Sequence, residues 1–145
     1  MELRRARFVG TFEHGLDDKG RMVLPAKVRA QLGETGVLAK LDGCLGLWTQ
    51  EGFDRVADQL ADHVAEGRAT AAALRVFMAD AAEVTPDQQG RVVIPQRLRA
   101  YAALGRDVVI TGRIDRAEIW DASRWAGLAT EGDADLAQAV AALRI

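Results

Sequence analysis

The sequence has very little of the side-chain chemistry on which enzymes and secreted proteins depend. Its 145 residues include one cysteine (Cys44), one serine (Ser123) and two histidines (His14 and His63). A single cysteine cannot form an internal disulfide, and no histidine lies near it in the sequence to suggest a catalytic dyad. The glycine-rich phosphate patterns GxGxxG and GxxxxGK[ST] are absent. We therefore expect no catalytic residues, no cofactor and no small-molecule substrate.

Metal-ligand patterns and long apolar runs are also missing. No spacing of cysteine and histidine indicates a metal site, so we expect no metal; a cation held by His14, Asp17 and Asp18 is the alternative that the residues leave open. No apolar run approaches the roughly 20 residues needed to cross a bilayer. The N-terminus MELRRARFVG lacks the apolar stretch of a signal peptide. These features indicate a cytoplasmic protein with no membrane partner.

What the sequence does contain is the composition of a packed globular protein, with basic charge confined to two short segments. Hydrophobic residues make up 49% and charged residues 28%, and the formal net charge is −2. An acidic chain is unusual for a nucleic-acid-binding protein. However, residues 17–29 hold four basic side chains against two acidic ones, and residues 87–99 hold three against one. An anionic partner would therefore meet these two segments.

The two basic segments are copies of one motif. LDDKGRMVLPAKVRAQLG (16–33) aligns with PDQQGRVVIPQRLRAYAA (86–103) at an offset of 70 residues. The match resumes downstream at an offset of 72, where two aromatic pairs align: Trp48 with Trp120 and Phe53 with Trp125. Chance similarity between amphipathic stretches does not account for so many ordered matches, so we interpret the chain as a tandem duplication.

Each copy is expected to form a turn, a strand, a short helix and two further strands. The β-prone runs after the turn end at Pro25 and Pro95, and proline favours the start of a helix. Between the copies, apolar residues spaced for one helix face run from Phe53 to Val64. Trp48 and Trp120 each end an apolar strand and are expected to anchor the core. The predicted organisation is repeat one at 8–54, a helical connector at 55–79, repeat two at 80–127, and a tail at 128–145, helical or disordered.

The DxxGR motif of each copy holds the candidate residues for contact with an anionic partner such as a phosphate or a guanine edge, which are Lys19, Gly20 and Arg21 in the first and Gln89, Gly90 and Arg91 in the second. Glycine can take positive φ and lets the backbone approach a phosphate closely. The adjacent arginine offers a planar fork that fits phosphate or guanine. Asp17 and Asp87 are expected to structure the loops by accepting backbone N–H bonds or by pairing with the arginine. The second copy has Gln88 and Gln89 in place of Asp18 and Lys19, so its loop is expected to bind DNA more weakly.

Alternatives remain for these basic residues. Arg21 and Arg91 could form internal salt bridges that support the fold. The basic residues of the short helices could contact DNA, but a solvated helix face is the usual explanation; they are Lys27, Arg29, Arg97 and Arg99. A protein that assembles with other proteins, without specific DNA binding, is the alternative function that the acidic remainder of the chain permits.

These motifs resemble those of the MraZ family, whose members contain two AbrB-like (SpoVT-AbrB) domains. The resemblance covers residues 8 to about 128, including LDGCLGLW and EIWDASRW. It implies an α+β fold that is mainly β with short helices. In that fold, two tandem copies of a swapped-hairpin β-barrel form a pseudo-dimer within one chain, with helices between and after the repeats.

The resemblance also implies a function. It indicates a sequence-specific transcriptional regulator that acts on the promoter of the division and cell-wall gene cluster and is associated with the nucleoid. The DxxGR loops would lie on one face of a ring-shaped homo-oligomer, and the DNA partner would carry short direct repeats. The N-terminal extension MELRRA is either an arm that contacts DNA or, the favoured alternative, a disordered and solvated end.

Overall fold

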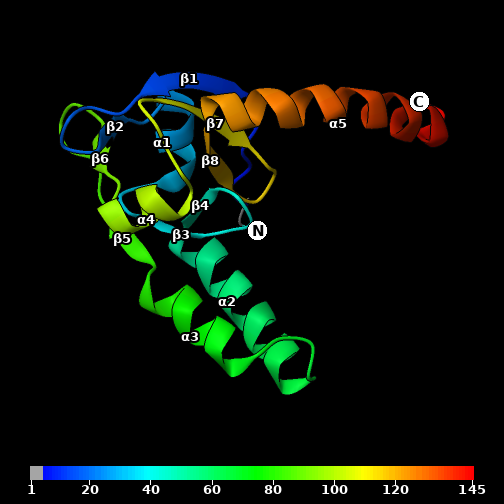
Figure 1. The fold of residues 1–145 in the computed structure, drawn as a ribbon, viewed down its shortest axis with the longest axis horizontal. Coiled ribbons are helices and arrows are strands. Elements are labelled where there is room, and N and C mark those ends of the chain that lie inside the picture. The colour runs from blue at the N-terminus through cyan, green and yellow to red at the C-terminus, as the bar shows by residue number, and fades with distance from the viewer. Residues whose placement is uncertain (1–4) are drawn as a thin grey trace, which may run out of the picture.

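A computed structural model describes residues 5–145 (Figure 1). Residues 1–4, which belong to the extension considered as a DNA-contacting arm, lie outside the described part. The first repeat contains β1 (Thr11–Gly15), β2 (Arg21–Val23), α1 (Ala26–Leu32), β3 (Gly36–Lys40) and β4 (Leu45–Thr49), followed by α2 (Gln50–Ala65) and α3 (Ala71–Ala79). The second repeat contains β5 (Ala82–Val84), β6 (Arg91–Val93), α4 (Gln96–Tyr101), β7 (Asp107–Gly112), β8 (Ala117–Asp121) and α5 (Ala122–Leu143).

The two repeats are interleaved in one six-stranded antiparallel sheet, with the strand order β1-β7-β8-β4-β3-β5. Exchanging the equivalent strands of the repeats, β1 with β5, β3 with β7 and β4 with β8, gives the same order read backwards. The first strand of each repeat therefore pairs with the third strand of the other. A second sheet pairs β2 with β6. The expected α+β class, with a β core of two swapped tandem copies, is confirmed.

The main core lies between the sheet and the two short helices that follow the DxxGR motifs. Alternate side chains of the central strands face inward, so that Leu38 lies opposite Leu47 and Ile110 opposite Ile119, all fully buried. Val28 of α1 and Leu98 of α4 are buried against the same cluster. Pro25 and Pro95 are the N-cap residues of α1 and α4, each directly before the first helical residue.

A second, smaller core is formed where α2 and α3 pack against each other and the sheet. The apolar stripe predicted from the sequence falls on α2, and Thr49 caps this helix by accepting a 3.0 Å hydrogen bond from the Gly52 backbone N–H. Phe77 of α3 stacks on Phe53 of α2 at 5.4 Å between ring centroids, and Trp48 lies edge-on to both. Figure 1 shows the two helices side by side, below the sheet.

The tail of the chain is a helix, α5, that begins directly after β8. The Asp121 carboxylate caps it by accepting hydrogen bonds from the backbone and hydroxyl of Ser123. It spans 22 residues, none of them buried, and Figure 1 shows its C-terminal half projecting from the body. The domain boundaries proposed from the sequence stay a prediction.

Candidate nucleic-acid interface

The first DxxGR loop is built around the Asp17 carboxylate. One oxygen accepts backbone N–H bonds from Lys19 (2.9 Å) and Arg21 (2.8 Å), and the other accepts the Arg21 Nε–H at 2.7 Å. The Gly20 N–H donates to the Asp17 carbonyl at 3.0 Å, which closes the turn. Backbone donors, chiefly the Arg21 N–H and then its side chain, hold the pKa of Asp17 below its ordinary value. The aspartate is therefore charged at neutral pH and fixes both the turn and the arginine.

The second loop repeats this geometry. The Asp87 carboxylate accepts backbone bonds from Gln89 and Arg91 and the Arg91 Nε–H, all at 2.9 Å. Its pKa is lowered, again mainly by the Arg91 backbone N–H. The replacement of Asp18 and Lys19 by glutamines thus leaves the loop framework unchanged and removes one negative and one positive charge from its tip.

Each loop arginine uses only one edge of its guanidinium for the aspartate. The salt bridges of Arg21 and Arg91 run through Nε, and within residues 5–145 their terminal amino groups have no hydrogen-bond partner. Both side chains are about one-third exposed. The internal salt bridge and a DNA contact are therefore compatible, because the terminal amino groups remain available to a phosphate or base edge.

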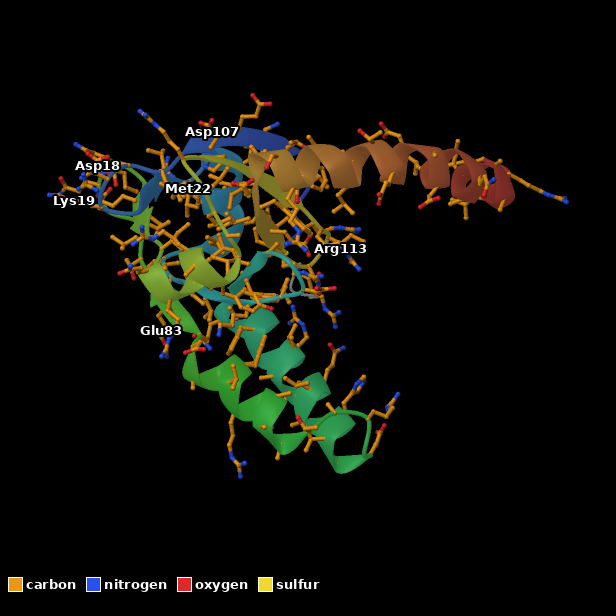
Figure 2. The ribbon with its side chains drawn as sticks, in the orientation of Figure 1. Asp18, Lys19, Met22, Glu83, Asp107 and Arg113 are labelled. Carbon is orange, nitrogen blue, oxygen red and sulfur yellow. The ribbon has the colours of Figure 1, made fainter. Side chains whose placement is uncertain are left out.

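The two loops are joined into one unit across the approximate twofold axis that relates the repeats. Strands β2 and β6 pair so that Arg21 lies opposite Val93 and Arg91 opposite Val23. Beyond the strands, the loop glycines take part in the pairing: the Gly90 carbonyl accepts from the Leu24 N–H at 2.8 Å, and the Gly20 carbonyl from Ile94 at 2.9 Å. Figure 1 shows β2 and β6 together at one end of the molecule, and Figure 2 shows Asp18 and Lys19 at the outer tip of the first loop, far from Arg113.

Two arginines of the short helices support these loops, a role that the sequence did not predict. Each packs against the loop glycine of the opposite repeat: a Cβ added at Gly20 would lie 2.6 Å from Cζ of Arg99, and one added at Gly90 would lie 2.7 Å from Nη1 of Arg29. The Arg99 Nε–H donates to the Ile94 carbonyl at 2.9 Å. The Arg29 Nε is buried and has no hydrogen-bond partner among the described residues. Glycine is favoured at both positions because φ is 74° at Gly20 and 78° at Gly90, and because a Cβ would displace the guanidinium.

The other candidates differ in their surroundings. Arg97 forms a 2.7 Å salt bridge with Asp80, which also binds Lys40, so Arg97 supports the fold. Lys27 is exposed on α1.

Val23 and Val93 are 43% and 53% exposed, which leaves a patch of apolar surface between the two loops. The two loops and the arginines packed on their glycines together carry five basic side chains, against three acidic ones (Asp17, Asp18 and Asp87): Lys19, Arg21, Arg29, Arg91 and Arg99.

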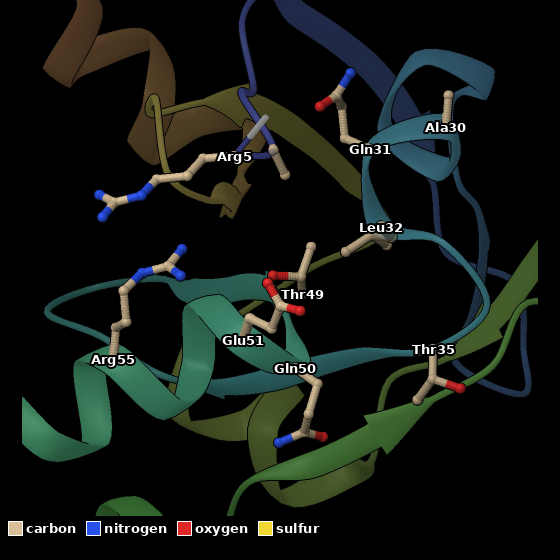
Figure 3. A pocket seen from close by; sticks show the side chains of 10 residues that line it. Arg5, Ala30, Gln31, Leu32, Thr35, Thr49, Gln50, Glu51 and Arg55 are labelled. Atoms are coloured by element: carbon tan, nitrogen blue, oxygen red, sulfur yellow. The ribbon is translucent and has the colours of Figure 1, made fainter. Parts of the chain in front are cut away.

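A reactive cysteine, a cavity and a cluster of metal ligands are the features that an enzyme would use. Cys44 is buried, and burial raises the pKa of its thiol to about 12, so it is not a nucleophile at neutral pH. One cavity, of about 680 Å³, is lined mainly by polar residues (Figure 3), but its Thr49 hydroxyl is engaged in capping α2. Within residues 5–145, no group of three histidine, cysteine or acidic residues is placed to hold a metal ion. The same residues include no helix long and apolar enough to span a membrane.

Comparison with known proteins places the chain in a family. The sequence model of the MraZ protein matches residues 7–76 and again residues 77–144. A protein of Salinispora arenicola named "Transcriptional regulator MraZ" is 45% identical over 131 residues, which cover 90% of this chain and 92% of the relative. Proteins of the same name from Kocuria rhizophila and Bifidobacterium longum are 44% and 42% identical, over 81% and 91% of this chain and 83% and 91% of their own lengths. The two repeats found in the sequence and interleaved in the sheet are therefore the two halves of an MraZ protein, and the chain belongs to the MraZ family.

Proposed function

We propose that the chain is a sequence-specific DNA-binding transcriptional regulator that reads DNA with its paired DxxGR loops. The observation that carries this proposal is the pair of arginine forks, each fixed by an aspartate through Nε and open at its terminal amino groups. A preorganised fork loses little freedom when it binds, and it fits guanine or phosphate in a bidentate manner. The names of the relatives support the same function.

One chain offers too few contacts for tight, specific binding. The paired loops present about five basic side chains, whereas specific protein–DNA interfaces use many phosphate and base contacts. We propose that several copies act together in a ring-shaped homo-oligomer, with their loops on one face. Such a ring would bind short direct repeats in the promoter of the division and cell-wall gene cluster, in the cytoplasm at the nucleoid. Tethering makes each later contact intramolecular and can raise avidity by about 10² to 10⁴.

The roles of the loop residues follow from their positions. Arg21 and Lys19 would contact DNA from the first loop, and Arg91 and Gln89 from the second, while the backbones at Gly20 and Gly90 bring each loop close to the duplex. Asp17 and Asp87 would hold the arginines in place without touching DNA. Because the second tip lacks a lysine, its contribution would be smaller.

Replacing Arg21 with alanine tests this mechanism. Each good bidentate contact is worth about 1–3 kcal/mol, so three engaged copies would lose roughly 3–9 kcal/mol, which is enough to abolish detectable binding. The assay is fluorescence anisotropy with the promoter duplex, and thermal melting checks that the variant folds. Arg113→Ala is the matched control, because Arg113 is exposed at a distance from the loops and its removal deletes the same charge.

The salt dependence separates base reading from phosphate contact. If the second loop reaches phosphate alone, Arg91→Ala should flatten the slope of log affinity against log salt by about 0.9 per engaged arginine, with sequence preference retained. A folded Arg21→Ala protein that binds the promoter as tightly as Arg113→Ala would refute the mechanism. Absence of binding to any DNA by the wild type would instead favour the assembly protein.

A further inference from the structure

A cavity of the first repeat lies apart from the paired loops. Its volume is about 680 Å³, and none of the residues that line it belongs to a DxxGR motif (Figure 3). Three segments meet there: the N-terminal segment at Arg5 and Ala6, the last turn of α1 with Thr35 after it, and the start of α2. Sites for small molecules usually have volumes of about 300–1,000 Å³, so the cavity is large enough for a metabolite.

Two arginines from different segments extend into this cavity. Arg5 comes from the N-terminal segment and Arg55 from the second turn of α2, and Figure 3 shows both guanidinium groups on the same side of the cavity. Within residues 5–145, neither guanidinium forms a salt bridge, although Glu51 also lines the cavity. Two positive charges that lie together without a paired carboxylate repel each other and attract an anion.

The second repeat shows that the fold does not need an arginine at position 55. At the offset of 72 residues that aligns α2 with α5, the counterpart of Arg55 is Gly127. The two helices nevertheless begin alike, since the Thr49 side chain caps one and the Asp121 side chain caps the other. A Cβ added at Gly127 would have no atom within 4 Å, so no neighbour replaces the missing side chain. Arg55 is therefore available to a ligand without cost to the fold.

Most of the other polar side chains around the cavity are already engaged. Gln50 and Thr35 form hydrogen bonds with residues outside the lining, and Thr49 caps α2. The Oε1 atom of Gln31 accepts the Arg7 backbone N–H at 2.9 Å, which ties the N-terminal segment to α1 and leaves the amide NH₂ group of Gln31 as a donor. The unused donors of the cavity are thus the two guanidinium groups and this amide, which suit a negatively charged ligand with a polar body.

We propose that this cavity binds a small phosphate-bearing metabolite through Arg5 and Arg55. A phosphate group carries up to two negative charges and three acceptor oxygens, so two arginine forks can share it, whereas one fork satisfies a carboxylate. Phosphate alone would fill a small part of 680 Å³, so the ligand carries a further polar body, such as a sugar or a nucleoside, within reach of Gln31. The site goes beyond the proposed function, because it lies outside the loops that would read DNA.

Isothermal titration calorimetry with AMP and with glucose 6-phosphate tests the class of ligand. The two probes share a phosphate group and differ in the body that carries it. At least one of them should bind with a Kd of about 1 mM or below, the range in which proteins bind metabolites. Adenosine and glucose, which lack the phosphate, should not bind detectably. Citrate should bind about tenfold more weakly than the better phosphate probe, because it offers carboxylates in place of a phosphate.

Single variants locate the binding. Arg5→Gln and Arg55→Gln should each weaken it by about 10- to 100-fold, the loss expected for hydrogen bonds to a charged group. Glu51→Gln should strengthen it, because the change removes the negative charge from the lining. Arg75→Gln is the matched control and should bind as the wild type does, since Arg75 is exposed on α3 and does not line the cavity. Circular dichroism should show the same helix content for all four variants.

The double variant Arg21→Ala/Arg91→Ala separates the cavity from the loops, whose arginines can also bind phosphate. It should keep the wild-type affinity for the phosphate probe, whatever its affinity for DNA. Loss of probe binding in this variant, with binding retained in Arg55→Gln, would overturn the proposal and assign the phosphate to the loops. Absence of binding by both phosphate probes would overturn it too, as would citrate that binds as tightly as they do, or an affinity unchanged in folded Arg5→Gln and Arg55→Gln.

Discussion

Replacing Gly20 with alanine should destabilise the protein through two separable effects. The first is conformational: the backbone φ of Gly20 is 74°, a left-handed value that costs an alanine about 1–2 kcal/mol. The second is steric, since the new Cβ would lie 2.6 Å from Cζ of Arg99. The arginine must then move and give up its 2.9 Å hydrogen bond to the Ile94 carbonyl, a charge-assisted bond worth about 1–2 kcal/mol. The expected loss is about 2–4 kcal/mol.

Gly67 provides a matched control for the conformational effect. Its φ is 76°, but no atom lies within 4 Å of a Cβ built on it. Gly67→Ala should therefore lose about 1–2 kcal/mol, the conformational part alone. In an Arg99→Ala background, Gly20→Ala should cost no more than this, because the clash has been removed.

Urea unfolding followed by circular dichroism, at one protein concentration, measures the four free energies. Equal losses for Gly20→Ala and Gly67→Ala would refute the reasoning. So would a loss at Gly20 that is the same with and without Arg99.

Acid titration and thiol labelling give two further predictions. Backbone N–H donors, and then the paired arginines, hold the pKa values of Asp17 and Asp87 below the unfolded value of about 3.9. Their contribution is complete above that value and is lost as the pH falls through the lowered folded pKa. The free energy of unfolding of Asp17→Asn/Asp87→Asn should therefore fall less steeply with acid than that of the wild type; parallel curves would contradict this. Because burial raises the Cys44 pKa to about 12, iodoacetamide near neutral pH should label Cys44 only as fast as the protein opens. Equal labelling rates with and without urea would exclude a buried thiol.

Local structure was predictable from the sequence because it depends on neighbours in the chain. The apolar spacing from Phe53 onward predicted the helix that is α2, and the helical connector expected up to residue 79 also contains α3. The short strands after each DxxGR turn are β2 and β6. In each case the residues that determine the element lie within a few positions of each other.

The support of one loop by the other repeat was not predictable in the same way. Arg29 and Arg99 were interpreted as a solvated helix face or as DNA contacts, because their helices are short and amphipathic. Their packing against Gly90 and Gly20 depends on the pairing of β2 with β6, which joins residues about 70 positions apart. No local pattern marks an arginine whose partner is a glycine in the other repeat, although the recurrence of Arg and Gly in both copies is a signal in retrospect.

The pairing of β1 with β7 also constrains how the protein can form during synthesis. The partner of Thr11 is Thr111, so the first strand made has no neighbour in its sheet until the ribosome has added about a hundred more residues. Contacts this distant in sequence form slowly, and an unpaired strand is exposed to aggregation while it waits. β3 and β4 can form a hairpin early, and α2 and α3 can cover it, which leaves β1 and β2 as the segments at risk.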